Sequence, residues 1–443
     1  LDYTRRCEMK TMFIPSTDLD GNKISYQYTI TKIELKRSLG SNTKRLKDIS
    51  VSITDGTRAI KEYVEKNGTN IISPGDVKNN NIYINNLKSI SKDKLTEKDY
   101  IIEGDILITT AGKSGQIVYV SRELEESAIT CDICRLRFSD ENYALGIYNF
   151  LKSDLGQLQL QSIMEGKLNR ISLKDIGNLL IPNDIKITGA TTKNRLDFQE
   201  QQNKIYRSCV NEFKKIVDYD PIDDKPKGTF YVKEKLLDSK RLDVKFYAYG
   251  GGILQRLISK DTKEIKWQNL GELVEIKRAI KPPISEDQEV NYFTLKNIDA
   301  GLSVMNTTEK GVYGQLSNRM RYIVKEGEIV TAKVGSATGK EGHISALITK
   351  STEGMLTTDA FFNIIPRKIN PYYLLFLLKQ PVILRQIEMN TKGELYKIIQ
   401  RDDFENIRIP RLNIDIENLI IQKMKEHIEG YEETLRSLRV EVE

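Results

Sequence analysis

An internal repeat is the feature that most constrains how this chain can fold. Residues 103–120 read EGDILITTAGKSGQIVYV, and residues 326–343 read EGEIVTAKVGSATGKEGH. Each stretch has Glu-Gly and an acidic residue, then a short apolar strand, then a turn rich in Gly, Ser and Lys. Gly104 and Gly327 lie 223 positions apart. Self-similarity at a fixed offset indicates that one structural unit occurs twice.

A second, longer match supports the duplication. Residues 148–182 end in GKLNRISLKDIGNLLIP, and residues 374–410 end in GELYKIIQRDDFENIRIP. Pro182 and Pro410 close these segments at an offset of 228, so the offset drifts by only five residues. A chain of 443 residues also suits two domains of about 150 to 200 residues each. The sequence therefore predicts two copies of one module.

The AGKSG sequence at 111–115 has an alternative interpretation as the end of a phosphate-binding loop. Such a loop needs a glycine five positions before Gly112 and a helix after the lysine. The residue at that position is Leu107, and Ser114 is followed by GQIVYV, whose β-branched and aromatic residues favour a strand. We therefore predict a β-hairpin turn here rather than a nucleotide site.

Catalytic, metal and cofactor motifs are weak in this sequence. Cys131 and Cys134 form a C-x-x-C pair, but a structural zinc site needs four ligands and no second pair lies nearby. The two histidines, His343 and His427, do not stand in a recognisable nucleophile context. We predict no catalytic residue, no metal and no cofactor, and we interpret the two cysteines as packed strand residues.

The composition predicts where the protein works. The chain is 39% hydrophobic and 29% charged, and no apolar run approaches the ~18 residues of a membrane span. Four cysteines fit a reducing compartment better than a disulfide framework. The chain opens at Leu1 without a signal or transit peptide pattern. We expect a cytoplasmic protein that does not enter a membrane.

Basic residues concentrate at the predicted turns, although the net charge is only +6. Basic loops interleaved with Thr, Ser and Asn suit phosphate positioning and contacts to base edges, whereas basic surface loops also occur for solvation alone. The residues that we predict to face DNA share a place on turns beside a sheet and a side chain that can contact phosphate or base atoms. They are Thr54, Asp55, Thr57, Arg58, Lys113, Ser114, Lys167 and Arg170 in the first module, and Lys277, Arg278, Lys281, Lys333, Ser336, Lys392 and Lys397 in the second.

An amphipathic helix is predicted after each module. Apolar residues recur at spacings of three and four, which is a helical seam, and two such helices in matching places can pack on each other. The seam residues are Phe198, Ile205, Cys209, Phe213 and Ile216 in the helix near 195–217, and Ile421, Met424, Ile428, Tyr431, Leu435 and Leu438 in the helix near 414–440.

Together these segments resemble the DNA-specificity subunits of Type I restriction-modification systems. The matching segments are RLKDIS (45–50) and WQNLGELVEI (267–276) at the module openings, the two Gly/Lys hairpins, the two closing segments, and FQEQQNKI (198–205) at the start of the first helix. The resemblance covers roughly residues 43–443 and depends on order and repetition. It departs from the family in residues 1–42, which match nothing, and in the helix start, which lacks the usual proline pair and leucine.

The resemblance implies an α/β (α+β) fold and a role in reading DNA. It implies two target-recognition domains, each a small twisted sheet with helices, separated by two long antiparallel helices that form a coiled-coil-like spacer. Each domain would read one half of a bipartite double-stranded DNA target, and two methyltransferase subunits and restriction motor subunits would join without any cofactor on this chain. The expected segments are 1–42, unplaced; 43–185, first recognition domain; 186–220, central spacer helix; 221–265, connector; 266–412, second recognition domain; 413–443, C-terminal spacer helix.

Two alternatives remain open on the sequence. The chain could be the recognition portion of a larger single-chain restriction-methylation enzyme, since it begins without Met. It could also be a scaffold of duplicated modules that binds no DNA. The gene upstream distinguishes the first alternative, because a separate methyltransferase frame favours a subunit and a fused frame favours the enzyme.

Overall fold

The computed structural model describes most of the chain in two compact units, residues 1–200 and 201–443. The described residues are 42–58, 63–64, 68–78, 81–82, 87–164, 169–183, 185, 189–219, 253–301, 303–393 and 396–440. The predicted N-terminal segment, except Asn42, therefore lies outside them, as do Lys167 and the part of the connector before residue 253.

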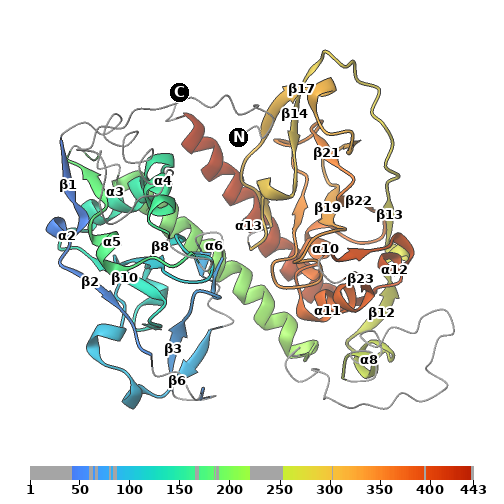
Figure 1. Ribbon diagram of the computed structural model, residues 1–443. Coiled ribbons are helices and arrows are strands. Elements are labelled where there is room, and N and C mark those ends of the chain that lie inside the picture. Colours follow the sequence, from blue (N-terminus) through green and yellow to red (C-terminus); the bar gives the residue numbers. More distant parts are fainter. Residues whose placement is uncertain are drawn as a thin grey trace. The chain divides into compact units, whose positions relative to one another are not determined.

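The described residues of the first unit form short strands, four α-helices and the beginning of a long helix (Figure 1). Its strands are β1 (Thr43–Arg45), β2 (Ser52–Asp55), β3 (Thr69–Ile72), β4 (Val77–Lys78), β5 (Asn81–Ile82), β6 (Lys88–Ile90), β7 (Ile106–Thr109), β8 (Ile117–Tyr119), β9 (Ala128–Ile129), β10 (Ile133–Arg137) and β11 (Leu180–Pro182). Its helices are α2 (Leu46–Ile49), α3 (Glu141–Lys152), α4 (Asp154–Ser162) and α5 (Leu173–Gly177), and α6 (Gly189–Ile216) begins in it.

The main sheet of the first unit has the strand order β2-β10-β7-β8 and is antiparallel throughout. A second sheet has the order β6-β3-β9, in which β3 and β9 run parallel. Helix α3 covers the main sheet, with Tyr148 packed edge-on against Tyr119 of β8. The main sheet and its helices thus enclose one apolar core.

The described residues of the second unit form a larger set of elements. Its strands are β12 (Lys266–Asn269), β13 (Val274–Ile276), β14 (Glu289–Phe293), β15 (Ile298–Asp299), β16 (Val304–Met305), β17 (Glu309–Val312), β18 (Met320–Ile323), β19 (Ile329–Ala332), β20 (Ser345–Leu347), β21 (Leu356–Thr358), β22 (Phe361–Pro366), β23 (Thr391–Lys392), β24 (Ile398–Ile399) and β25 (Arg408–Arg411). Its helices are α8 (Ile253–Ile258), α9 (Leu270–Leu273), α10 (Pro371–Leu377), α11 (Pro381–Asn390), α12 (Arg401–Glu405) and α13 (Ile414–Val440).

The two units repeat one topology, which confirms the predicted duplication and the mixed fold class. The order β13-β22-β19-β20 in the second unit reproduces β2-β10-β7-β8 in the first. The closing pair β12-β25 reproduces β1-β11, and the parallel pair β14-β21 reproduces β3-β9. A sequence offset of about 221 to 228 residues therefore relates equivalent strands.

A buried glutamine shows the duplication at the level of single hydrogen bonds. The Gln159 side chain donates to the carbonyl of Leu180 at 2.9 Å and accepts from the Leu180 N–H at 2.8 Å. Gln386 makes the same two bonds to Arg408, at 2.9 and 2.7 Å. A side-chain amide matches a backbone amide in having one donor and one acceptor, so it can occupy the place of a neighbouring strand. Neither glutamine was singled out from the sequence, although both belong to the repeated segment.

The hairpin predicted at AGKSG is confirmed. Strands β7 and β8 pair antiparallel, and the turn between them contains Gly112 and Gly115 with φ of 74° and 81°. A residue other than glycine rarely adopts these angles, which explains the glycines without a phosphate ligand. No helix follows Lys113 before the strand, so the nucleotide-loop geometry is absent from this described segment.

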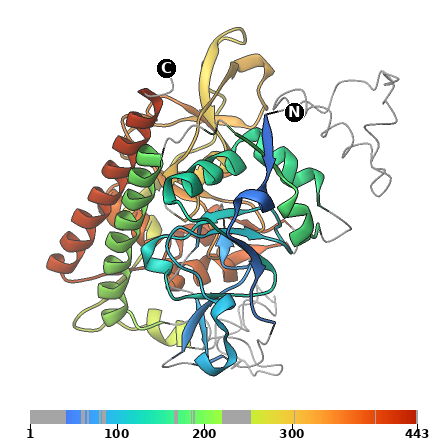
Figure 2. The ribbon, with the colours of Figure 1, turned by 90° about the vertical axis from the view of Figure 1, so that its left-hand side faces the viewer.

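The C-terminal half of α6 packs beside α13 within the second unit (Figure 2). Ser208 accepts a hydrogen bond from the Lys423 ammonium at 2.7 Å, and the Tyr206 ring lies 6.1 Å from His427. Because the partner number falls as the α6 number rises, the two helices run antiparallel. None of the described helices is both long and apolar enough to cross a bilayer.

The structure places most of the predicted seam residues in one core and others outside it. Cys209, Phe213, Met424, Ile428 and Tyr431 are buried in the core of the second unit, and Ile216 and Ile421 pack against its edge. The packing face of α6 includes Tyr206, while Ile205 lies outside this core. Ile420 and His427 of α13 are also buried. Phe198 is half-buried in the part of α6 that belongs to the first unit, and the side chains of Leu435 and Leu438 lie outside the described residues.

Candidate nucleic-acid interface

One end of the main sheet in the first unit collects segments that are distant in sequence. Strand β2 ends at Asp55, and β10 begins at Ile133 opposite Thr109, the last residue of β7. The segment before α5 joins this end because the Ile171 N–H donates to the carbonyl of Thr110 at 3.0 Å. We call residues 54–58, 110–116, 130–133 and 169–171 the loop end of the first sheet. It contains all of the described DNA-facing candidates of the first unit.

The equivalent end of the second sheet is built in the same way. Ala332, the last residue of β19, pairs with Phe361, the first residue of β22. The Ile399 N–H donates to the carbonyl of Lys333 at 3.1 Å, which brings the segment before α12 to this end. We call residues 277–281, 333–343, 359–361 and 391–399 the loop end of the second sheet, of which 394 and 395 are not described.

The acidic residue of the repeated motif anchors both units from inside. Asp105 accepts from the Ile102 N–H at 3.0 Å, and Glu328 accepts from the Lys325 N–H at 3.0 Å. Both carboxylates are buried, at 1% and 4% exposure. The Asp105 carboxylate also receives two bonds of 2.7 Å from Arg137. The role that the two repeats share at this point is therefore structural. In each unit a buried carboxylate accepts a backbone hydrogen bond across the turn that precedes the central strand.

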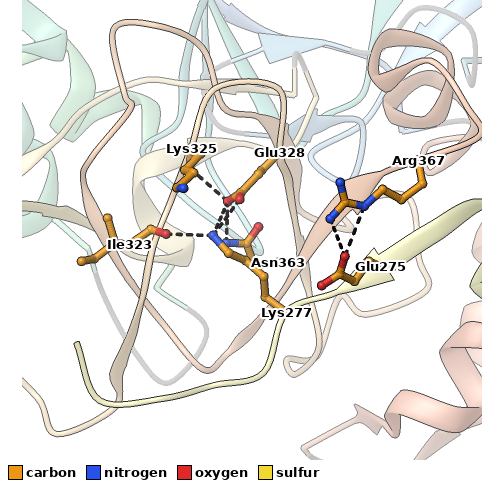
Figure 3. A network of polar contacts seen from close by, with 7 residues as sticks. All are labelled: Glu275, Lys277, Ile323, Lys325, Glu328, Asn363 and Arg367. Atoms are coloured by element: carbon orange, nitrogen blue, oxygen red, sulfur yellow. Dashed lines mark hydrogen bonds and ion pairs between the residues drawn. The ribbon is translucent and has the colours of Figure 1, made fainter. Parts of the chain in front are cut away.

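Lys277 belongs to this internal network rather than to the loop surface (Figure 3). Its ammonium lies 2.7 Å from one carboxylate oxygen of Glu328 and donates to the carbonyl of Ile323 at 3.0 Å. The Asn363 amide donates to the same carboxylate at 2.9 Å. A cation that neutralises a buried acid is not available to a phosphate, so Lys277 is left out of the interface proposed below.

Lys397 is used in the same internal way. It is only 8% exposed, and its ammonium lies 3.1 Å from Glu388, which also pairs with Arg385 at 2.9 Å. The sequence could not reveal this pairing because the partner carboxylate lies on α11, beyond a turn. Lys397 is therefore also left out of the proposed interface.

The remaining candidates differ in how far their side chains reach solvent. Thr57 is buried, Thr54, Asp55, Ser114 and Lys333 are partly buried, and Arg58, Lys113, Arg170, Arg278, Lys281, Ser336 and Lys392 are exposed. Lys281 pairs with Glu286 at 2.8 Å, and Lys392 lies 3.9 Å from Asp403. Such exposed pairs contribute little stability, so a phosphate can replace the carboxylate at small cost.

An equivalent lysine was missed in the second unit. Gly112-Lys113 in the first hairpin turn corresponds to Gly339-Lys340 in the second, and the two glycines have φ of 74° and 75°. Both lysines are exposed. The repeated Gly-Lys-x-Gly pattern, GKSG and GKEG, was the signal that could have identified Lys340. The longer second turn obscured it by shifting the alignment.

His343 holds the second turn in place. Its Nδ1 accepts from the Gly339 N–H at 3.2 Å, so the neutral ring carries its proton on Nε2, which lies 2.8 Å from the Thr331 hydroxyl. The Lys379 ammonium donates to the His343 carbonyl at 2.6 Å. Burial, followed by the Lys379 charge, lowers the pKa of His343 from 6.5 to about 3. The histidine is thus a neutral turn anchor.

This histidine predicts a loss of stability in acid. The unfolded chain binds a proton at His343 below a pKa of about 6.5, whereas the folded chain does so only near 3, so stability falls as the pH falls through this window. We expect about 2 kcal/mol to be lost between pH 7 and pH 5 from this group. Urea unfolding followed by Trp267 fluorescence measures it, with His343→Gln as the comparison. Equal losses in both proteins would contradict the assignment.

The prediction that both cysteines of the C-x-x-C pair are packed strand residues holds for Cys134 but is wrong for Cys131, which lies in the turn before β10. Cys134 is fully buried within β10, and burial, reinforced by the Asp55 charge, raises the pKa of its thiol. Cys131 is partly buried, and both are free thiols. Among the described residues no group of His, Cys, Asp and Glu is arranged to hold a metal ion.

Comparisons with known proteins give likenesses in structure alone. No family model and no curated protein matches the sequence. Among solved structures, the HsdS subunit from Thermoanaerobacter tengcongensis matches with 14% identity and a TM-score of 0.27, over 90% of this chain and 92% of that one. The S subunit of a Type-I restriction-modification system from M. genitalium matches with 14% identity and a TM-score of 0.36, over the same shares. The type IIG restriction endonuclease BpuSI matches with 14% identity and a TM-score of 0.31, over 39% of this chain and 28% of that chain. Over about nine tenths of its length the chain is thus similar to the solved HsdS subunit and to the solved S subunit of a Type-I restriction-modification system.

Proposed function

We propose that this protein is the sequence-specific DNA-binding specificity subunit of a Type I restriction-modification complex. The observation that carries the proposal is the repeated loop end: two sheets of one topology each present an exposed Gly-Lys turn, at Lys113 and Lys340. Exposed cations position a protein on phosphates, and neighbouring polar side chains read base edges. Two equivalent readers on one chain suit a double-stranded target with two separated halves.

The partners and compartment follow from the same proposal. We infer that two methyltransferase subunits, and restriction motor subunits through them, dock on this chain in the cytoplasm. The chain itself is non-catalytic and needs no cofactor. Purified alone with S-adenosylmethionine, ATP and magnesium, it is expected to transfer no tritiated methyl group to DNA and to leave DNA uncut. Methyl transfer by the isolated chain would contradict the subunit assignment and favour a single-chain enzyme.

The proposed interface predicts how affinity depends on salt. Each lysine that neutralises a phosphate adds about 1 to the slope of log affinity against log salt concentration. We expect Lys113→Ala and Lys340→Ala each to reduce this slope by about 1, and the double variant by about 2. Fluorescence anisotropy with a labelled DNA duplex at several salt concentrations measures the slopes.

Two matched variants test whether the reduction in salt slope is specific to the loop ends. Lys47 is exposed on α2, which precedes β2 and so lies away from the loop end, and Lys47→Ala should keep the wild-type slope. Arg278→Ala, at the loop end of the second sheet, should reduce the slope or relax selectivity for one half-site only. An equal loss of slope in Lys47→Ala and Lys340→Ala would indicate diffuse attraction by the whole surface.

A further inference from the structure

Buried polar side chains interrupt the apolar packing between α6 and its neighbours in the second unit. Gln202 of α6, Gln380 at the start of α11 and His427 of α13 are 1 to 2% exposed. Tyr206 of α6 lies among them, and burial raises the pKa of its hydroxyl. We call these four residues the polar layer. A buried polar group costs stability unless it is matched by a partner, so this layer requires an explanation.

The contacts of the polar layer are directional. The Gln380 amide donates to the carbonyl of Phe376 at 2.9 Å and to the Tyr206 hydroxyl at 3.4 Å, which ties α6 to the α10–α11 corner. The Tyr206 ring lies 6.1 Å from the His427 ring, which ties the same residue to α13. The Gln202 Oε1 atom has no hydrogen-bond partner among the described residues.

The buried side chains of the neighbouring turn are apolar and impose a weaker constraint, and the part-buried Lys423–Ser208 hydrogen bond at its edge is absent from both cysteine pairs used below. Cys209, Phe213, Ile420 and Met424 share the core there. Apolar contacts are non-directional, so a shift of α6 along α13 by one helical turn, about 5.4 Å, would exchange one apolar contact for another. The same shift would separate Tyr206 from Gln380 and leave buried polar atoms without partners. A polar residue in a helical seam commonly specifies register in this way, at a cost in stability.

We propose that the polar layer fixes the axial register of α6 against α13 and thereby sets the length of the gap between the two DNA half-sites. The second clause rests on the function proposed above. Helix α6 is continuous from Gly189 to Ile216, and its first part belongs to the first unit while its second part belongs to the second. A slip of α6 along α13 therefore carries the first unit with it. Tyr206 and Gln380 are positioning residues in this device and do not contact DNA.

Cross-linking reads the register without DNA. Ser208→Cys with Lys423→Cys marks the observed register, because these side chains lie 2.7 Å apart, and Ser208→Cys with Leu419→Cys marks a register shifted by one turn. In the otherwise native chain, a short bismaleimide should link the first cysteine pair about tenfold faster than the second. Peptide mass mapping of the products excludes links to the native cysteines. In the layer variant, Gln202→Leu with Tyr206→Phe and His427→Leu, we expect the preference to fall below about threefold.

A control variant and a selection of DNA targets complete the test. Met424→Leu changes the apolar turn at constant volume and should keep the native cross-linking preference. Selection of targets from a library of half-site gaps should give one gap for the native chain and for Met424→Leu, and a range of gaps for the layer variant with unchanged half-sites. If the layer variant melts below the native chain, Tyr206→Phe with Gln202→Leu replaces it in both arms.

The outcomes distinguish a failure of this inference from a failure of the proposed DNA-binding function on which its second clause rests. A layer variant that keeps both the tenfold cross-linking preference and a single gap would overturn the inference. A native chain that selects no two-part target would instead overturn the proposed function, and the cross-linking arm would still decide whether the layer sets the register. Broadened gaps together with broadened cross-linking support both clauses.

Discussion

Glu328→Gln is expected to lower the free energy of unfolding of the second unit by about 3–5 kcal/mol. The substitution keeps the shape of the side chain but leaves the Lys277 ammonium without its counter-charge in a site where Glu328 is 4% exposed. Breaking a buried ion pair by removing one partner costs up to this much, because the other charge, here on a Lys277 side chain that is 24% exposed, stays largely desolvated. Trp267 is the single tryptophan of the chain and is buried in the second unit, so its fluorescence in urea reports this unfolding directly.

A matched control lies in the same unit (Figure 3). The Arg367–Glu275 pair links the residue after β22 to β13 at 2.5 Å, but its side chains are 59% and 54% exposed. Exposed pairs contribute ~0–1 kcal/mol, so Glu275→Gln should unfold almost as the native chain does. Equal losses in the two variants would show that Glu328 is not a buried anchor.

The Lys277–Glu328 pair also allows a test of whether Lys277 is a structural lysine or a DNA-binding one. Lys277→Met should destabilise the second unit, and combining it with Glu328→Gln should recover part of the loss, because no isolated charge then remains buried. At a temperature where the double variant is folded, its salt slope for DNA binding should equal that of the native chain. A slope reduced by about 1 would return Lys277 to the interface.

Inserting four helix-forming residues between Glu200 and Gln201 is expected to lengthen the preferred gap between half-sites by one or two base pairs. The α-helix rises 1.5 Å per residue, so the insertion adds about 6 Å while changing the rotational phase by about 40°. DNA advances about 3.4 Å per base pair. The position matters because α6 packs in the core of the second unit through side chains between Tyr206 and Ile216, whereas an insertion near Asn211 would also displace Cys209 from that core.

Target selection from a gap library measures this effect. The same four residues inserted after Gly354, in an exposed turn of the second unit, should leave the gap unchanged. A constant gap in the Glu200 variant would mean that α6 does not measure the distance between half-sites. Altered half-site sequences would mean that the loop ends are not the readers.

The sequence by itself determined the architecture because its signals are local and occur twice. The alternating and β-branched runs before each Gly-Lys turn predict strands, the spacing of three and four predicts helices, and equivalent positions recur at nearly constant offset. Each of these patterns depends on backbone geometry that a short segment specifies alone. The β7–β8 hairpin, its counterpart β19–β20 and the two long helices were therefore predictable from residue order.

The tertiary structure alone decided which charged and polar side chains remain available for function. Lys277 and Lys397 are indistinguishable from Lys113 in sequence, yet each is held by a carboxylate on another element, Glu328 or Glu388. The energy of a charge depends on its surroundings: a cation beside a buried acid is retained by desolvation and Coulomb attraction, whereas an exposed one is screened by water. Those surroundings are assembled from segments that are distant in sequence, so the pairing of charges is defined only once the tertiary structure has formed.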